Sequence, residues 1–294
     1  MRLFVTGSTG FVGSAVVKEL ISAGHEVLGL ARSDAAAQLL LSAGAEVQRG
    51  SLEDLGCLRS GAANSEGVIH LGFNHDFSKF KENCEVDKLA IEALGSALEG
   101  SDRPLIVTSG TAGLSAPGQL ATEDDVLPPN SPLPRVSEQT AFAMLQKGVS
   151  ASVVRLPQVH DTVKQGLVTY LIALAREKGV SAYVGEGLNR WSAVHVLDAA
   201  HLYRLALEKH EAGARYHAVA EEGVLMRDIA ETIGRGLQVP VKSLAPEEAA
   251  AHFGWLDMFA SHDLPASSAA TQEKLGWHPS GPGLIADLER VHYL

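Results

Sequence analysis

The clearest chemical pattern in this chain is a glycine-rich turn close to its start. Residues 6–13 read Thr-Gly-Ser-Thr-Gly-Phe-Val-Gly and stand between an apolar run and a helical pattern. Glycines at this spacing allow a tight turn, a close approach of the backbone to a pyrophosphate, and close packing of the helix on its strand. The Lys-Ser/Thr ending of a triphosphate-binding loop is missing, which leaves a dinucleotide site or a plain structural turn. The residues expected to hold the pyrophosphate are Gly7, Ser8, Thr9, Gly10, Phe11, Val12 and Gly13.

The end of the next apolar run indicates which dinucleotide is bound. Sites for NAD place an Asp or Glu at this point, on the ribose hydroxyls. Here Arg32 stands next to the place of that acid, and Ser33 follows it. A guanidinium binds phosphate through paired hydrogen bonds, and a serine adds a hydroxyl donor. We therefore expect NADP(H) in preference to NAD(H), the alternative being that Arg32 is a solvated charge. Asp34 is expected to cap the following helix.

Short apolar runs and helical patterns alternate through the first half of the chain. Strands are expected at 2–6, 26–31, 46–49, 68–71, 105–108 and 152–156, and helices at 11–23, 34–43, 85–98 and 135–145. Because the strands are continuous apolar runs, they are typical of a parallel sheet covered on both faces. The pattern predicts a Rossmann-type, doubly wound α/β fold. Residues 1–157 would form the NAD(P)-binding core, and 158–294 a small α/β region that mainly binds substrate, with some segments returning to the core.

Six segments in order carry a resemblance to a known family. They are the turn at 6–13, Val-Ile-His-Leu at 68–71, Ile-Val-Thr-Ser at 106–109, Arg-Leu-Pro at 155–157, Val-His-Val-Leu-Asp at 194–198 and Leu-Gly-Trp-His-Pro at 275–279. Through them nearly the whole chain resembles the extended short-chain dehydrogenase/reductases, the NAD(P)-dependent epimerase/dehydratase group. The resemblance implies that Arg32 binds the 2′-phosphate. It also places Ser51 and Leu52 beside the adenine, Leu71, Gly72 and Phe73 behind the ribose and nicotinamide, and Pro157 over the nicotinamide. Core packing is the alternative for Leu71, Phe73 and Pro157.

The catalytic pattern of that family is broken in this chain. The resemblance implies a Tyr-xxx-Lys pair on the helix before the sixth strand. In this chain Pro134 stands at the position of the Tyr and Glu138 at the position of the Lys. Gly110 falls where the family has its active hydroxyl, between Ser109 and Thr111. Either hydroxyl could bind a carbonyl oxygen, although such hydroxyls as often cap local backbone.

A different proton donor is therefore expected if the protein is an enzyme. The candidates are Thr111, Glu138 and His160, while a structural His160 and a solvated Glu138 are the alternatives. Arg135 lies one helical turn before Glu138 and could add positive charge on the same face. Asn74 and Trp191 are the candidate substrate contacts, with a half-buried aromatic as the alternative for Trp191.

Three functions are compatible with these residues. The first is an NADP(H)-dependent reductase of a small carbonyl or an activated C=C or C=N compound. The second is a non-catalytic NADP(H)-binding sensor or interaction protein, which the missing Tyr-Lys pair favours. The third is a nucleotide-sugar epimerase or dehydratase, ranked last because such enzymes depend on the same Tyr.

The acidic composition of the chain argues against nucleic acid as a partner. With 24 Lys plus Arg against 35 Asp plus Glu, the 294-residue chain has a net charge of −11 and no basic footprint for nucleic acid. No apolar run suits a signal peptide or a membrane span. Cys57 and Cys84 are expected to be reduced, and the spacing of the 12 His residues suggests no metal site. We expect a cytoplasmic protein with a small-molecule substrate, and the sequence allows a homodimer.

Overall fold

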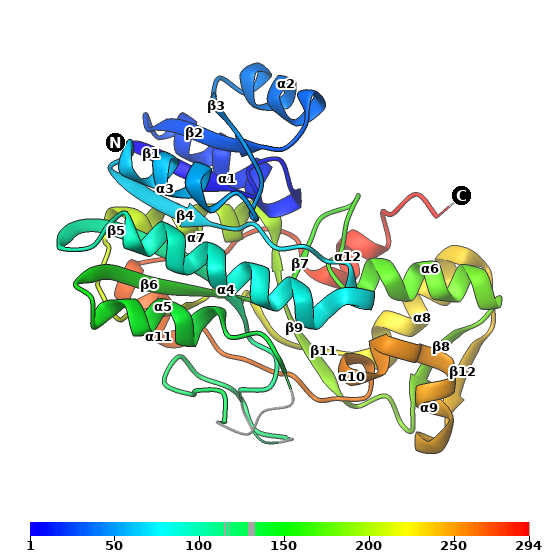
Figure 1. The fold of residues 1–294 in the computed structure, drawn as a ribbon. Coiled ribbons are helices and arrows are strands. Elements are labelled where there is room, and N and C mark those ends of the chain that lie inside the picture. The colour runs from blue at the N-terminus through cyan, green and yellow to red at the C-terminus, as the bar shows by residue number, and fades with distance from the viewer. Residues whose placement is uncertain (115, 117, 129–132, 294) are drawn as a thin grey trace.

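The computed structural model describes residues 1–114, 116, 118–128 and 133–293. Its centre is a seven-stranded sheet in which every neighbouring pair of strands is parallel (Figure 1). The strand order is β10-β6-β5-β4-β1-β2-β3. The strands are β1 (Arg2–Thr6), β2 (Glu26–Ala31), β3 (Glu46–Arg49), β4 (Gly67–His70), β5 (Ser101–Gly110), β6 (Val149–Leu156) and β10 (Arg215–His217). This order, reversing beside β1, confirms the doubly wound Rossmann-type fold.

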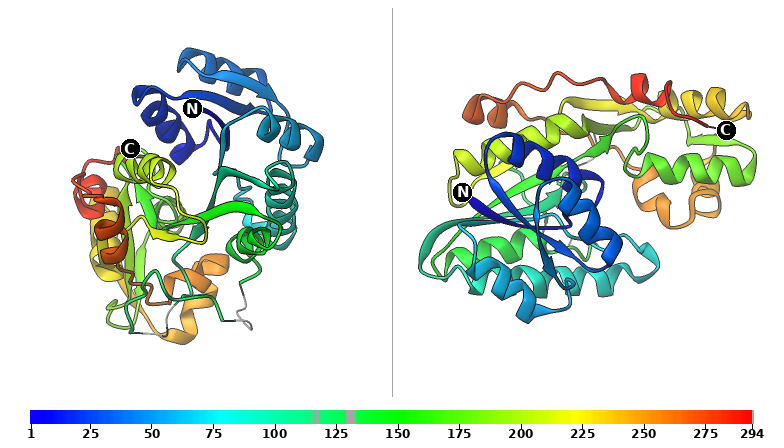
Figure 2. Two further views of the ribbon diagram at one scale, coloured as in Figure 1. Left: turned by 90° about the vertical axis from the view of Figure 1, so that its left-hand side faces the viewer. Right: turned by 90° about the horizontal axis from the view of Figure 1, so that it is seen from above.

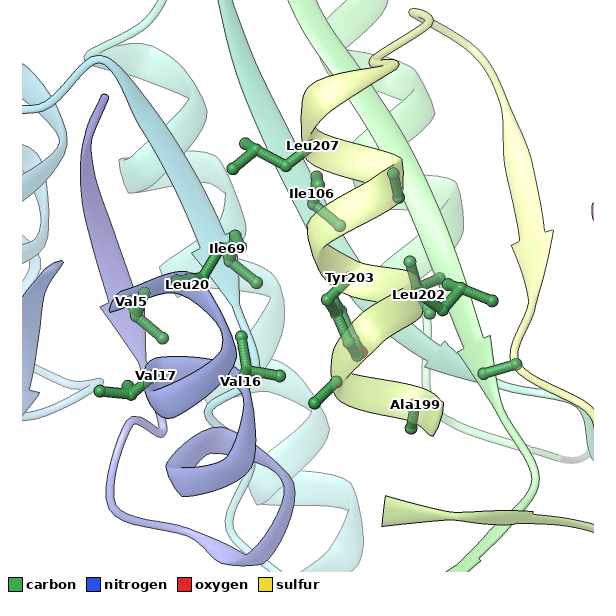
Figure 3. Close-up of a cluster of buried hydrophobic side chains, with 14 of the residues drawn as sticks. Val5, Val16, Val17, Leu20, Ile69, Ile106, Ala199, Leu202, Tyr203 and Leu207 are labelled. Carbon is green, nitrogen blue, oxygen red and sulfur yellow. The ribbon is translucent and has the colours of Figure 1, made fainter. Parts of the chain in front are cut away.

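Helices cover both faces of this sheet. One face carries α1 (Phe11–Ser22) and α7 (Val196–Glu208), and the other carries α3 (Leu55–Ala63), α4 (Phe80–Ser96) and α5 (Ser137–Leu145). In Figure 3, Leu20 of α1 and Tyr203 of α7 point into one buried cluster with Ile69 and Ile106 of the sheet. Burial of both faces explains why the strands read as continuous apolar runs.

The rest of the chain forms a smaller part at one end of the sheet. Its strands pair as β11-β9-β7 and β12-β8. These elements are β7 (Gln158–His160), α6 (Val168–Lys178), β8 (Ser181–Val184), β9 (Arg190–His195), β11 (Glu221–Leu225), α8 (Met226–Leu237), β12 (Val241–Leu244), α9 (Pro246–Phe253), η2 (Gly254–Leu256), α10 (Asp257–Ala260) and α12 (Leu284–Leu288). Helix α11 (Ala269–Leu275) instead returns to the main sheet beside β10. Figure 2 shows the C-terminal segments running along one side of the core and continuing beyond it. This part has its own buried cluster, around Trp191 and Met226.

Two of the differences from the sequence prediction have clear local causes. The first turn of α2 (Asp34–Ser42) is capped by Ser33, whose hydroxyl accepts the Ala36 N–H at 3.2 Å. The expected cap, Asp34, is the first helical residue instead and pairs with Arg49. Helix α3 was not predicted, because its glycines weaken the helical pattern although its inner face is buried.

Candidate functional site

One cavity of about 870 Å³ joins the two parts of the molecule. Its walls come from the carboxyl ends of β1, β2, β4, β5 and β6, from η1 (Phe77–Lys79), and from α6 and α10. The sequence-predicted residues that line it are Gly7, Thr9, Gly10, Phe11, Val12, Gly13, Arg32, Ser51, Leu52, Leu71, Gly72, Phe73, Asn74, Ser109, Thr111, Pro157 and Trp191. Ser8, Ser33, Glu138 and His160 do not line it. A crevice at the carboxyl ends of parallel strands, where the strand order reverses, is the usual ligand position in this fold class.

The glycine-rich turn lies at one end of this cavity and fits a pyrophosphate. Gly10 precedes α1 in an extended conformation, and no described side chain caps the first helical turn, whose N–H groups remain available to an anion. Gly7 has φ +65°, and a Cβ there would lie 2.7 Å from the Gly72 nitrogen. Ser8 is buried and donates its hydroxyl to the Leu30 carbonyl at 3.0 Å, so its side chain serves the sheet.

Gly13 gives a direct test of this turn. A Cβ at this position would overlap the carbonyl group of Gly7, so Gly13→Ala must open the turn. We expect its affinity for NADPH to fall at least about tenfold, by fluorescence titration, because the backbone N–H groups lose their alignment. Gly56→Ala is the matched control, since its Cβ would approach nothing closer than an Asp54 oxygen at 3.5 Å. Equal affinities of the two variants would contradict the assignment.

The opposite side of the turn is the expected adenosine end. Arg32 lines the cavity here, and no described residue forms a hydrogen bond or ion pair with its guanidinium. Ser33, expected as a second phosphate donor, uses its hydroxyl to cap α2. Glu53 is the one carboxylate among the described lining residues, and it follows Ser51 and Leu52. The described wall of this end thus presents an unpaired cation beside the end of β2.

The other end of the cavity lies beside the end of β5. The Thr108 hydroxyl bonds Tyr203 of α7 at 2.7 Å, so Ser109, the next residue along the strand, faces the opposite layer of helices. No described residue hydrogen-bonds the Ser109 hydroxyl. Thr111 bonds Ser192 at 3.4 Å, and Ser192 in turn donates to the Leu264 carbonyl at 3.3 Å. Ser109 is therefore the freer of the two predicted hydroxyl donors.

Arg135 brings a fixed positive charge to the same end. Its guanidinium donates to the Thr108 carbonyl at 3.1 Å and to the Ser137 hydroxyl at 2.9 Å. The guanidinium carbon also lies 4.4 Å from the centre of the Phe73 ring, a cation–π distance. No described residue accepts a hydrogen bond from its Nη1, and Arg135 lines the cavity. From the sequence, Arg135 stood out only as a helical neighbour of Glu138.

A buried hydrogen-bonded chain holds Arg135 from behind. Ser137 donates to Asp87 at 2.5 Å, and Asp87 lies 3.1 Å from Nε2 of His70. The other ring nitrogen of His70 is 2.7 Å from the Thr6 hydroxyl, which accepts the Gly72 N–H at 3.1 Å. Burial alone would raise the pKa of Asp87, but its bonds to His70 and Ser137 and the charges of His70 and Arg135 lower it. This series of hydrogen bonds connects Thr6, at the end of β1, to Arg135, and the ionised carboxylate of Asp87 lies in its middle.

Two predicted proton donors are placed away from the cavity. Glu138 accepts two hydrogen bonds from Arg155 and one from Arg215, each at 2.7 Å. His160 is fully buried and bonds Asp287 at 2.7 Å. These geometries correct the expectation that either side chain faces a substrate, because each is held by ionic partners in the interior. Trp191 does line the cavity but is 1% exposed, and its Nε1 donates to the Phe259 carbonyl.

Three further cavity residues were missed by sequence reasoning. His75, Lys164 and Tyr170 line the wall opposite the glycine turn, and no motif marks them. Burial, with the positive charges of Arg135 and Lys164, lowers the pKa of His75. The ring is therefore neutral at neutral pH and is no ready acid.

No group of three or more His, Cys, Asp or Glu side chains among the described residues is arranged to hold a metal ion. Within the same part of the chain, no helix combines the length and apolar character needed to span a bilayer.

Comparison with known proteins places this geometry in a family. The model of the NAD dependent epimerase/dehydratase family matches residues 3–220. An uncharacterized protein of Schizosaccharomyces pombe is 50% identical over the full length of both chains. The decarboxylating sterol-4-alpha-carboxylate 3-dehydrogenase of Dictyostelium discoideum is 29% identical, over 77% of this chain and 73% of that protein. The UDP-glucose 4-epimerase of Thermus thermophilus, solved with NAD, superposes with a TM-score of 0.77 at 19% identity, covering 100% of this chain and 99% of its own. The chain thus belongs to the NAD-dependent epimerase/dehydratase family, the extended short-chain dehydrogenase/reductases.

Proposed function

We propose that this protein is an NADP(H)-dependent reductase of a small carbonyl compound, or of a related activated C=C or C=N compound. The observation that carries the proposal is the single cavity, which joins Arg32 and the glycine turn to Ser109 and Arg135. The sterol dehydrogenase among the relatives is named for oxidation at a ring carbon, which supports redox chemistry at a carbonyl carbon.

The residues divide the proposed work between two ends of the cavity. The turn at 7–13 and the N–H groups of α1 would hold the pyrophosphate, and Arg32 the 2′-phosphate. When bound, the reduced nicotinamide supplies a hydride. Ser109 and Arg135 would hydrogen-bond the carbonyl oxygen and stabilise the negative charge that develops there. Water in the cavity would then protonate the alkoxide, since Pro134 and Glu138 stand at the positions of the family's Tyr and Lys.

The alternative is a non-catalytic NADP(H)-binding protein. It is favoured by the positions of the family's Tyr and Lys, which here hold Pro134 and the buried, ion-paired Glu138. Neither the Ser109 hydroxyl nor Nη1 of Arg135 has a partner among the described residues, and both residues line the cavity. This favours the reductase, because such donors suit a substrate oxygen that a pure binding protein does not need.

The proposal is tested first on the cofactor. Arg32→Ala is expected to weaken NADPH binding by about tenfold to a hundredfold, the value of charge-assisted hydrogen bonds to one phosphate. Its affinity for NADH should stay within a factor of about two, because NADH lacks the 2′-phosphate. Calorimetric titration of both cofactors measures this, with the exposed Arg59→Ala as control. Equal losses for NADPH and NADH would contradict the assignment.

The reaction itself is tested by NADPH consumption with a panel of aldehydes, ketones and enones. We expect turnover of at least one compound, with the alcohol or saturated product found by mass spectrometry. Tight NADPH binding with no turnover across a broad panel would favour the non-catalytic alternative.

A further inference from the structure

Lys164 is a cation that the proposed reaction does not use. It stands in a tight turn after β7, where the Asp161 carboxylate accepts the N–H groups of Val163 and Lys164 at 2.7 Å each. The Asp161 N–H also donates to the Lys164 carbonyl at 2.8 Å. The backbone of this lysine is therefore fixed, while its side chain lines the cavity. No described residue accepts a hydrogen bond from its ammonium group.

The charge balance around Lys164 is unusual for so acidic a protein. The described lining of the cavity contains one carboxylate, Glu53, and that residue belongs to the Arg32 end. At the far end the charged lining residues are Arg135 and Lys164, both close enough to His75 to disfavour its protonation. Asp87 balances Arg135 through Ser137, but no described carboxylate pairs with the Lys164 ammonium group, which marks a place for a negative charge from outside.

Aromatic rings form the wall beside these cations. Phe77 is stacked on Trp255, with ring centres 4.2 Å apart, and meets Tyr170 edge-on at 6.1 Å. Phe259 of α10 continues the wall, 6.5 Å from Phe77. Phe77, Tyr170 and Phe259 line the cavity, whereas Trp255 stacks on Phe77 without lining it. Tyr170 is 38% exposed. A cavity wall of aromatic rings that are still partly exposed favours a flat apolar ligand, which would cover them.

We propose that the substrate of this site has a flat apolar body and carries a carboxylate, which Lys164 binds while the aromatic wall around Phe77 covers the body. Arg135, fixed on Thr108, stays with the reacting oxygen. The inference rests on the proposed function for the position of that oxygen. The binding of the carboxylate itself does not require turnover.

The test uses 2-naphthoate and 2-naphthamide, two flat compounds of nearly equal shape that differ in charge. Each is titrated by calorimetry into the protein saturated with NADP⁺. We expect 2-naphthoate to bind about threefold to fivefold more tightly than 2-naphthamide, because Lys164 is exposed at the cavity and an ion pair in contact with water is weak. Lys164→Gln should remove most of this preference and leave the amide unaffected. The control is Lys147→Gln, an exposed lysine beyond α5 that does not line the cavity.

Each outcome decides the proposal. Equal binding of the two compounds to the wild type overturns it, as does a preference that survives Lys164→Gln but disappears in Arg135→Met. If acetate bound as tightly as 2-naphthoate, the aromatic wall would contribute nothing to binding, and the proposed flat apolar body would be wrong. A carboxylate preference that depends on Lys164, found in a protein that turns over no ketone, supports this inference and counts against the reductase.

Discussion

Replacing Arg135 with methionine is expected to lower kcat for a carbonyl substrate by about 10²–10³-fold, the usual loss for one donor to a developing oxyanion. Methionine keeps much of the side-chain length and its contact with the Phe73 ring, but it has no charge and no N–H donors. The KM for NADPH should change little, because the turn at 7–13 and Arg32 lie at the other end of the cavity. Stopped-flow measurement of NADPH oxidation in a single turnover isolates this step.

Two further variants distinguish the charge of Arg135 from the hydrogen bonds that fix its position. Arg135→Lys keeps the charge but cannot bond both Thr108 and Ser137 as the guanidinium does, so an intermediate rate is expected. Ser137→Ala cuts the buried chain from Asp87 and should lower kcat without removing the charge. Added guanidinium should partly restore an Arg135→Ala variant, which leaves room for it, but not the Ser137→Ala variant. An Arg135→Met rate within about threefold of wild type would end the role of Arg135 as an oxyanion donor.

Replacing Glu138 with glutamine is expected to cost about 3 kcal/mol of unfolding free energy at pH 7, near the lower end of losses from broken buried ion pairs. Arg155 is fully buried and would lose its countercharge. The loss stays near that lower end because the Asp125 carbonyl and His217 still accept hydrogen bonds from Arg155. Urea unfolding gives the measurement, with the exposed Glu231→Gln as control.

The same variant predicts a pH dependence. Burial opposes ionisation of Glu138, but the bonds and charges of Arg155 and Arg215 outweigh it and lower its pKa below the ordinary 4.5. A carboxyl with a lowered folded pKa contributes stability that is complete above its unfolded pKa and is lost as pH falls through the folded value. The difference between wild type and Glu138→Gln should therefore shrink below about pH 4.5. A difference that stays constant down to pH 3, or one under about 0.5 kcal/mol at pH 7, would show that the ion pair does not stabilise the fold.

The sequence was most informative where structure depends on neighbouring residues. The bounds of β1, β2 and β3 match the prediction, because each is an apolar or mixed run ended by a turn residue. The glycine turn was located for the same reason: its function follows from backbone geometry within eight consecutive positions. The position of Arg32 beside the cofactor could be predicted because it directly follows β2, whose end is clear from the sequence pattern.

The sequence was least informative where function depends on distant residues. Glu138 resembled a solvated helix residue, and its partners Arg155 and Arg215 are 17 and 77 positions away. The hydrogen-bonded series that holds Arg135 includes Asp87, which lies 50 positions before its partner Ser137. Lys164 and Tyr170 reach the cavity only because the C-terminal part folds back against the sheet. Long-range contacts of this kind leave no spacing signal in a single sequence.

The late position of β10 in the chain has a consequence for how the protein is made. β10 pairs with β6 at the sheet edge, and α7 supplies Leu202 and Tyr203 to the core shared with Val5 and Ile69 (Figure 3). A nascent chain that has left the ribosome only as far as Pro157 therefore has an open β6 edge and an uncovered apolar face. The dinucleotide-binding half cannot finish folding as a separate early unit. Its completion waits for residues up to His217, so the core of the cofactor half closes only after Phe77 and Tyr170 of the cavity wall have been made.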